Sequence, residues 1–402
     1  MKTDLIRQLS EELESELTNN ILPYWMDKMV DEQNGGFYGQ VTGEEQLVEK
    51  APKGGILNAR ILWTFSAAYR TFQVPEYLET ARRAKDYIID HFFDKTYGGT
   101  YWSLNYKGEP SDTKKQIYSV AFFIYALSEY FAATGDKLCL DKAIGLFHLI
   151  EEHSFDKNLN GYFEAYSHDW KLLDDLRLSN KDANEKKTMN SHLHILEAYT
   201  NLCRVWKDDF LKKQLENLVI IFFEKILDNK TFHLNLFFNE NWECKSSVTS
   251  YGHDIEASWL LLEAANVLDN VNIIKRAREI CKLMASANLE GLQEDGSIIY
   301  EKNNNTGHIN YERDWWVQAE GVVGYMNAFE VTGNKKFLDN SVNCWNYIKE
   351  NLIDHVNGEW FWGIKKDGSI NRTDDKAGFW KCPYHNSRAC MEMMHRYKSL
   401  SY

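Results

Sequence analysis

The chain has 402 residues, of which 26% are charged, and 46 basic against 59 acidic residues leave a net charge of −13. The ordinary apolar share excludes a disordered chain, and the acidic balance argues against a general nucleic-acid binder. No uninterrupted apolar run approaches the ~20 residues of a membrane span, and the acidic, amphipathic start has no apolar signal core. Seven widely spaced cysteines without a CxxC pair indicate reduced thiols. We therefore expect a cytoplasmic protein, a monomer, with no nucleic-acid or membrane partner.

Long helices dominate the predicted structure. Only five prolines interrupt the chain, and apolar residues recur at the i, i+3, i+4 and i+7 spacing of a buried helix face. The pattern predicts twelve helices, over residues 4–31, 54–73, 76–94, 114–134, 137–154, 187–206, 208–228, 252–269, 271–288, 311–332, 335–353 and 382–398.

A short glycine–aromatic segment returns between these helices. Its strong copies centre on Gly36, Gly99, Gly161, Gly296 and Gly358, spaced by 62 or 63 residues except for one interval of 135. A weaker copy at 233–242 divides that interval into two units. The chain thus contains six units of helix, turn, helix and short β-hairpin, which predicts one domain over residues 1–402.

Six helical hairpins form either an open solenoid or a closed ring. The second helix of each pair carries the more charged face, as an outer helix should, and the first is richer in aromatic and small residues. We therefore predict an all-α fold, an (α/α)6 toroid or barrel with short β-hairpin segments at one face. The open solenoid remains the alternative, since the number of helices does not distinguish the two.

The inner helices of such a ring carry polar and aromatic residues that an apolar lining does not need. Because they recur about once per repeat, they meet at one mouth of the barrel, where an arginine, three histidines, a carboxylate and aromatic rings would line a cleft. They are Arg60, Tyr118, His194, His253, Trp316, Glu320 and His385.

Neighbouring residues sharpen this prediction. Glu256 lies three residues after His253 on the same helix face, within reach to orient its ring, and the helix N-terminus lowers the pKa of His253. Asn190 lies on the face of His194. Tryptophans beside the site, whose faces stack on sugar rings, predict a carbohydrate ligand. They are Trp315, Trp316, Trp360, Trp362 and Trp380.

Each feature also has a simpler interpretation. A histidine on an inner face is often a hydrogen-bonded core residue, and a salt bridge would satisfy a buried Arg60 without catalysis. Three histidines from separate helices could bind zinc, although no metal-ligand spacing such as HExxH is present. A glycoside hydrolase would use two of Asp254, Glu256 and Glu320. A non-catalytic carbohydrate-binding solenoid is the alternative without catalysis.

Six motifs together resemble the N-acylglucosamine 2-epimerase superfamily, and most closely its members that act on β-1,4-linked disaccharides. They occur in the expected order over about 330 residues, as NARILW (58–63), YSVAFFIYAL (118–127), MNSHLHILEAYT (189–200), SYGHDIEASW (250–259), WWVQAE (315–320) and WKCPYHNSR (380–388). The resemblance implies an (α/α)6 barrel and reversible inversion at C2 of the reducing-end glucose, with no cofactor and no metal. Aldose–ketose isomerases and N-acylglucosamine or mannobiose epimerases of the same family remain alternatives.

The resemblance also implies roles for single residues. Arg60 corresponds to the residue that holds the C1 and C2 oxygens, His253 and His385 to the acid/base pair, and His194 to a third essential histidine. Substrate contacts fall on Tyr118, Asn190, Trp316 and Trp380, whereas Glu256 and Glu320 correspond to carboxylates that orient histidines.

The residue types suit this chemistry. Removing the C2 proton of an opened sugar places negative charge on O1, which a fixed cation stabilises. Returning a proton to the opposite face needs a second group, and histidine titrates in the appropriate range.

Overall fold

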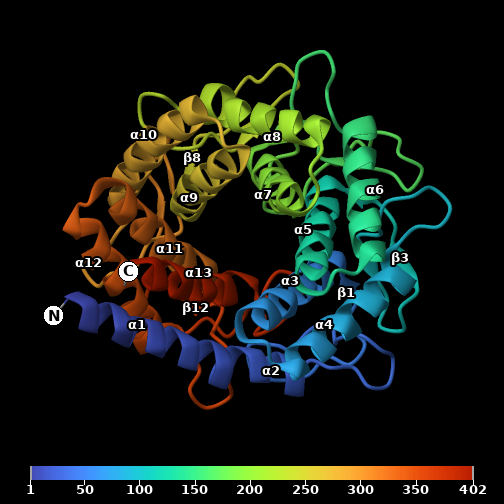
Figure 1. Cartoon of the computed structure of the whole chain (residues 1–402), viewed down its shortest axis with the longest axis horizontal. Helices are drawn as coiled ribbons and strands as arrows, with labels where there is room; N and C mark the ends of the chain where they lie inside the picture. The colour runs from blue at the N-terminus through green and yellow to red at the C-terminus, as the bar shows by residue number, and fades with distance from the viewer. Residues whose placement is uncertain (1, 401–402) are drawn as a thin grey trace.

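Six inner helices form a closed ring. The computed structural model describes the backbone of residues 2–400 and the side chains of residues 6–398, so residues 1 and 401–402 of the predicted domain lie outside the described part. Each inner helix contacts the next, and the last contacts the first, which closes the ring (Figure 1). The inner helices are α3 (Gly55–Phe72), α5 (Ile117–Thr134), α7 (Met189–Val205), α9 (Tyr251–Leu268), α11 (Trp315–Thr332) and α13 (Tyr384–Leu400).

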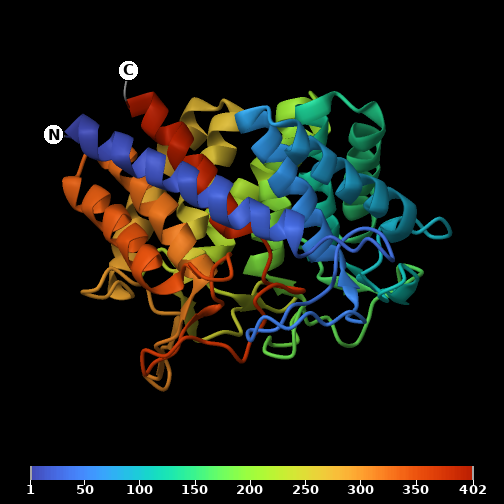
Figure 2. The same ribbon diagram turned by 90° about the horizontal axis from the view of Figure 1, so that it is seen from below.

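An outer layer of helices surrounds this ring. The acidic first helix packs against α13, so the two termini lie side by side and the first residues complete the last repeat (Figures 1 and 2). The outer helices are α1 (Lys2–Glu16) with α2 (Leu22–Asp27), α4 (Pro75–Tyr87), α6 (Lys137–His153), α8 (Asp209–Ile221), α10 (Val271–Ala287) and α12 (Lys335–Tyr347). The (α/α)6 toroid is therefore confirmed, and the open solenoid is excluded.

Short turns of other helical types extend several outer helices. π-Helical turns are η1 (Leu17–Ile21), η2 (Ile88–Phe92), η3 (Phe222–Ile226) and η5 (Ile348–Leu352), and a 3₁₀ turn is η4 (Asn288–Glu290). The inner helices are almost completely buried; in α5, for example, every residue from 117 to 130 is buried. Among the described residues, α5 is the one helix with the length and hydropathy of a membrane span, and 78% of it lies inside the protein.

Twelve short strands gather at one end of the ring (Figure 2). They pair antiparallel in five small sheets, ordered β1-β2-β3, β4-β5, β6-β7, β10-β9-β8 and β11-β12. Their bounds are β1 (Lys53–Gly54), β2 (Ser103–Leu104), β3 (Pro110–Asp112), β4 (Lys115–Gln116), β5 (Ala165–Tyr166), β6 (Lys187–Thr188), β7 (Phe237–Phe238), β8 (Val248–Ser250), β9 (Glu301–Asn303), β10 (Ile309–Asn310), β11 (Arg313–Asp314) and β12 (Gly363–Ile364).

These strands explain where the predicted helix boundaries are wrong. Helices predicted from residues 114, 187 and 311 begin two to four residues later, because the intervening residues belong to β4, β6 and β11. The backbone there bonds to a strand about 50 residues later in the chain, after the next outer helix, although the apolar spacing continues without a break. The first helix likewise ends at Asp27 rather than at residue 31, since Val30 pairs with Phe37.

A buried ion pair recurs at this end of the ring and was not predicted. A lysine that lies two residues before an inner helix, or eight residues before it in the case of α13, bonds an aspartate that begins the preceding hairpin. The same carboxylate accepts backbone amides two and three residues ahead. The pairs are Lys53–Asp31 at 2.9 Å, Lys115–Asp94 at 2.6 Å, Lys187–Asp156 at 2.8 Å and Lys376–Asp354 at 2.6 Å. Each pair fixes the point at which a chain segment enters the barrel.

Candidate active site

A cavity of about 470 Å³ opens at the strand-bearing end of the barrel. Nine of the ten predicted site residues line it: Arg60, Tyr118, Asn190, His194, His253, Glu256, Trp316, Trp380 and His385. The tenth, Glu320, is 1% exposed and lies behind His385. The structure thus brings residues from all six inner repeats to one space.

Two imidazoles that border this cavity both pack against one indole. The ring centroid of Trp316 lies 4.8 Å from that of His253 and 5.7 Å from that of His385. Trp316 reaches this position because residue 252 is a glycine, where an added Cβ would lie 2.5 Å from the indole. The close approach of the indole thus requires glycine at this position.

Each of the three imidazoles has its own polar partner at Nδ1. His385 lies 2.7 Å from Oε1 of Glu320, and His194 lies 2.9 Å from Oε2 of Glu197. His253 lies 2.7 Å from the Ser250 hydroxyl. These contacts fix the ring orientations and leave Nε2 of each ring for the cavity.

The prediction that Glu256 orients His253 is therefore wrong. In the second turn of α9, Oε1 of Glu256 instead accepts a hydrogen bond from Arg388 at 2.7 Å. Its distance to Nδ1 of His385, 3.9 Å, is too long for a hydrogen bond.

All three imidazoles have pKa values below that of a free histidine. Burial, together with repulsion from His194 and His385, lowers the pKa of His253 to about 3. Burial lowers the pKa of His385 to about 3 despite its contact with Glu320, and it lowers that of His194 despite Glu197. At neutral pH these rings are therefore unprotonated bases, and the cause is burial rather than the predicted effect of a helix terminus.

Arg60 supplies a positive charge that no carboxylate neutralises. None of the described carboxylates lies within 4 Å of it; instead it donates to the Tyr118 hydroxyl at 2.8 Å and contacts Sγ of Cys382 at 3.7 Å. Its guanidinium carbon lies 4.2 Å from the Phe122 ring centre, and its Nε has no partner. Because arginine stays charged at all accessible pH values, the site attracts an anion. The salt-bridge alternative for Arg60 is thus excluded among these residues.

Arg388 is the opposite case, a cation shared by three carboxylates. Its Nη2 donates to Glu256 at 2.7 Å and to Glu320 at 2.6 Å, and its Nη1 donates to Glu197. Glu256, Glu320 and His385 are close enough to hold a metal ion, but the guanidinium already binds both carboxylates. A metal ion bound by these residues would therefore have to displace Arg388.

Unpaired polar atoms and tryptophans complete the cavity. Oδ1 of Asn190 has no hydrogen-bond partner among the residues that the structure describes. Trp315, Trp362 and Trp380 line the cavity, as predicted. Trp360 does not: it is fully buried, and its indole donates to Glu16 of the N-terminal helix.

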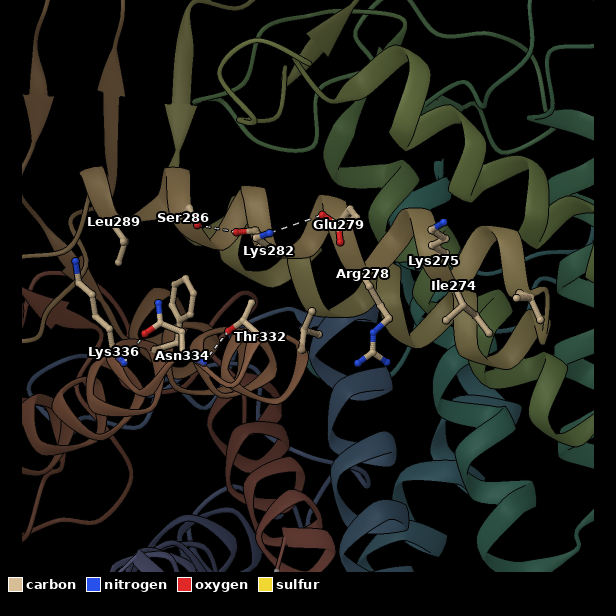
Figure 3. A pocket seen from close by; sticks show the side chains of 13 residues that line it. Ile274, Lys275, Arg278, Glu279, Lys282, Ser286, Leu289, Thr332, Asn334 and Lys336 are labelled. Atoms are coloured by element: carbon tan, nitrogen blue, oxygen red, sulfur yellow. Dashed lines mark hydrogen bonds and ion pairs between the residues drawn. The ribbon is translucent and has the colours of Figure 1, made fainter.

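A second cavity of about 390 Å³ adjoins the first and shares His253, Asn190 and Trp362 with it. Its other wall includes the loop around residues 176–185. A third cavity, of about 980 Å³, is a groove between α10 and the α11–α12 turn, and none of the predicted site residues lines it (Figure 3). Lysines and arginines on its walls face solvent, and it holds no group suited to the predicted chemistry.

Comparisons with known proteins agree with this geometry. The sequence profile of the N-acylglucosamine 2-epimerase (GlcNAc 2-epimerase) family matches residues 36–389. The chain belongs to this family.

Relatives in this family match over nearly the whole chain. The chain is 59% identical over 386 residues to the cellobiose 2-epimerase of Bacteroides fragilis, which covers 96% of this chain and 98% of that protein. It is 40% identical over 392 residues to the cellobiose 2-epimerase of Dictyoglomus turgidum, covering 97% and 99%. The solved structure of cellobiose 2-epimerase from Bacillus thermoamylovorans superposes with a TM-score of 0.92 and 41% identity, covering 97% and 100%.

Three polar residues of this family member escaped the sequence reasoning: Ser250, Glu197 and Arg388. Glu197 follows His194 by three residues and Arg388 follows His385 by three, the same helical spacing that suggested Glu256 as the partner of His253. At this spacing the structure has a contact at His194, which was not predicted, and none at His253, where one was predicted. Sequence spacing gives the face of a helix, whereas the neighbouring helices decide which side chain meets which.

Proposed function

We propose that this chain is a cofactor-independent cellobiose 2-epimerase, an isomerase that inverts C2 of the reducing-end glucose of β-1,4-linked disaccharides. The observation that carries the proposal is the placement of two unprotonated imidazoles against one indole, beside an arginine without a carboxylate partner. The names of the relatives support the same reaction and substrate.

In this mechanism the sugar ring opens first, so that C1 becomes a carbonyl and the C2 proton becomes acidic. One imidazole removes that proton, and the other delivers a proton to the opposite face of C2. His385 and His253 exchange these roles between the two directions of reaction. Glu320 stabilises the imidazolium that forms at His385, because its carboxylate lies 2.7 Å from the ring.

Arg60 carries the electrostatic part of the reaction. Proton removal converts the aldehyde into an enediolate with negative charge on O1, and a guanidinium without a carboxylate partner is free to bind it. One such preorganised donor typically lowers the activation barrier by ~3–4 kcal/mol. Tyr118 holds the guanidinium in place, and His194 assists ring opening or binds an oxygen of the intermediate.

The second sugar of a disaccharide occupies the adjoining cavity, according to this proposal. Trp362 borders both cavities, and Trp316 and Trp380 border the inner one, so apolar sugar faces find aromatic partners. A hydrolase is disfavoured because it would leave the three histidines and Arg60 without a role, and because Asp254 is fully buried against His233 at 2.7 Å.

The decisive experiment is incubation with cellobiose in D₂O, followed by identification of the product. Glucosyl-mannose with deuterium at C2 supports the proposal. A fructose-containing product would instead identify an aldose–ketose isomerase, which shares the enediolate but protonates C1. Parallel incubations with mannobiose, mannose and N-acetylglucosamine determine which sugars the enzyme accepts. We also expect full activity after EDTA treatment.

The proposal extends to a cytoplasmic monomer. All seven cysteines are free, and Cys244 alone among them is exposed, which suits a reducing compartment. Light scattering of the purified protein tests the assembly, and cell fractionation tests the location.

A further inference from the structure

Three carboxylates converge on one guanidinium behind the catalytic imidazoles. Glu197, Glu256 and Glu320 are each at most 2% exposed, as is Arg388, which donates to all three. If all three carboxyl groups were ionised, this cluster would carry an excess of two negative charges away from water. A buried cluster of this kind retains a proton instead.

The hydrogen bonds indicate which carboxyl group holds that proton. Glu197 accepts from Arg388 and Tyr384 and contacts His194, and Glu320 accepts from Arg388 and from the Trp259 indole at 3.0 Å and contacts His385. Both are well supplied with partners for the ionised form. Glu256 has Arg388 alone among the described residues, and of the three it is the one that lines the sugar cavity.

The charged and titratable groups around Glu256 come from several helices. They are Arg388, Tyr384 and His385 on α13, Glu320 on α11, Glu197 on α7, Tyr118 on α5, and His253 on its own helix α9. Burial and the charge of Glu320 raise the pKa of Glu256 to about 8, whereas Arg388 and His194 lower that of Glu197 to about 2 despite its burial. These pKa shifts agree with the hydrogen bonds, of which Glu256 accepts fewer than Glu197.

We infer that Glu256 is a neutral carboxylic acid in the resting enzyme and that it donates its proton to the ring oxygen when the sugar opens. This inference rests on the proposed epimerase function. It answers a question that the two imidazoles leave open, because both are unprotonated at rest and neither can supply that proton.

The resulting cycle balances. In ring opening, the bond between C1 and the ring oxygen breaks, Glu256 protonates the ring oxygen, and His253 takes the O1 proton as the C1 carbonyl forms. His385 then takes the C2 proton, and the imidazolium of His253 returns a proton to the opposite face of C2. On ring closure the C5 hydroxyl returns its proton to Glu256, and His385 protonates O1. All three groups regain their resting states, and no oxidant or cofactor is consumed.

Mutarotation separates ring opening from epimerisation. Starting from one pure anomer of cellobiose, NMR measures how much each protein accelerates anomer interconversion beyond the buffer rate. We expect Glu256→Gln to lose both the acceleration and epimerisation, and His385→Ala to keep the acceleration while losing epimerisation. The matched control is Glu263→Gln, a carboxylate two turns further along α9 that pairs with Arg204, which should retain both. Undiminished mutarotation by Glu256→Gln would overturn the inference.

Infrared spectroscopy tests the resting proton without using activity, so its outcome does not depend on whether cellobiose is the substrate. At pH 7 the difference spectrum between the wild type and Glu256→Gln should contain the carbonyl stretch of one buried protonated carboxyl group, and the difference spectrum between the wild type and Glu263→Gln should not. A wild type minus Glu256→Gln spectrum without that band would place the proton elsewhere and overturn the inference. If the infrared result holds while the wild type leaves cellobiose unchanged, the proposed substrate is wrong and the assignment of the proton stands.

Discussion

Buried charge is arranged in two ways in this molecule, and the contrast separates structure from function. At the strand-bearing end, four lysines each bond an aspartate, and the aspartate also accepts two backbone amides. At the centre of the barrel, Arg60 has no carboxylate partner and Arg388 has three. Both arrangements lie in the same barrel, and the side chains that form them are almost fully buried.

The difference shows where each charge finds its counter-charge. The lysine pairs are complete in the folded chain, so they stabilise the entry points of the inner helices. The central charges are incomplete without a ligand, since Arg60 lacks an anion and the Arg388 cluster holds a surplus of carboxylates. Variants at the two places should therefore affect different quantities, activity at the centre and stability at the strand-bearing end.

The largest expected effect is on catalysis at the imidazoles. His253→Ala and His385→Ala should each reduce kcat ~10²–10⁴-fold, because general acid–base groups contribute that much. Thermal unfolding should show no loss of stability, because neither imidazole belongs to one of the four lysine–aspartate pairs at the strand-bearing end. The control is His168→Ala, which removes an imidazole from the surface of the Lys115–Asp94 pair. If either catalytic variant kept a near-wild-type rate, two-base epimerisation would be refuted.

Arg60→Met should reduce kcat ~10²–10³-fold, the range seen when one preorganised donor to a developing oxyanion is removed. Its stability should equal or exceed that of the wild type, because a buried charge without a carboxylate partner is costly to bury. Arg60→Lys, which keeps the charge but not the fork of donors, should recover part of the rate. The paired measurements are steady-state kinetics and calorimetry, and a large loss of stability in Arg60→Met would show that its charge is structural.

Lys187→Met should do the reverse. Nζ of Lys187 bonds Asp156 and the backbone carbonyls of Asn160 and Glu240, so its loss leaves a buried carboxylate unpaired at a cost of ~3–5 kcal/mol. The kcat below the unfolding temperature should stay near that of the wild type. Lys230→Met, at an exposed lysine, serves as the control and should change neither quantity. Equal stability of the two variants would remove the structural role assigned to these pairs.

The sequence predicted the ring better than its details, for reasons visible in single residues. Apolar periodicity located all the inner helices, because burial on a helix face leaves a pattern in the chain. It did not reveal that Lys115 and Lys187 belong to strands, since pairing with a hairpin is decided by distant residues. Nor could it show that Lys187 meets Asp156, because both lie in stretches that are rich in charge.

The candidate site was predicted in the same way. Repeat spacing brought His194, His253 and His385 together because helices of equal length end at one mouth of a ring. The partners of those rings depend on helix rotation, which spacing along one helix does not specify. Glu256 therefore received the wrong partner, and Arg388, which meets carboxylates from α7, α9 and α11, was missed.

The last prediction concerns acid stability and compares the two regions directly. The pKa of His385 falls from its usual 6.5 to about 3 on folding, mainly through burial, so below pH 6.5 the unfolded chain binds a proton that the folded chain does not. The unfolding free energy therefore decreases as the pH falls from 6.5 toward 3, by at most ~1.4 kcal/mol per pH unit. His253 adds a smaller share, because the edge of its half-buried ring faces the cavity.

The lysine-paired aspartates respond at lower pH. Burial alone would raise the pKa of Asp354, but its bonds to Lys376 and to backbone amides lower it to about 2, so its contribution is present above pH 4 and lost as the pH falls toward 2. His385→Gln should thus flatten the stability curve between pH 6 and 4 and leave the steeper loss below pH 4 unchanged. Denaturant unfolding at successive pH values measures both limbs. A variant that flattened the lower limb instead would mean that the imidazole, not the aspartates, governs acid unfolding.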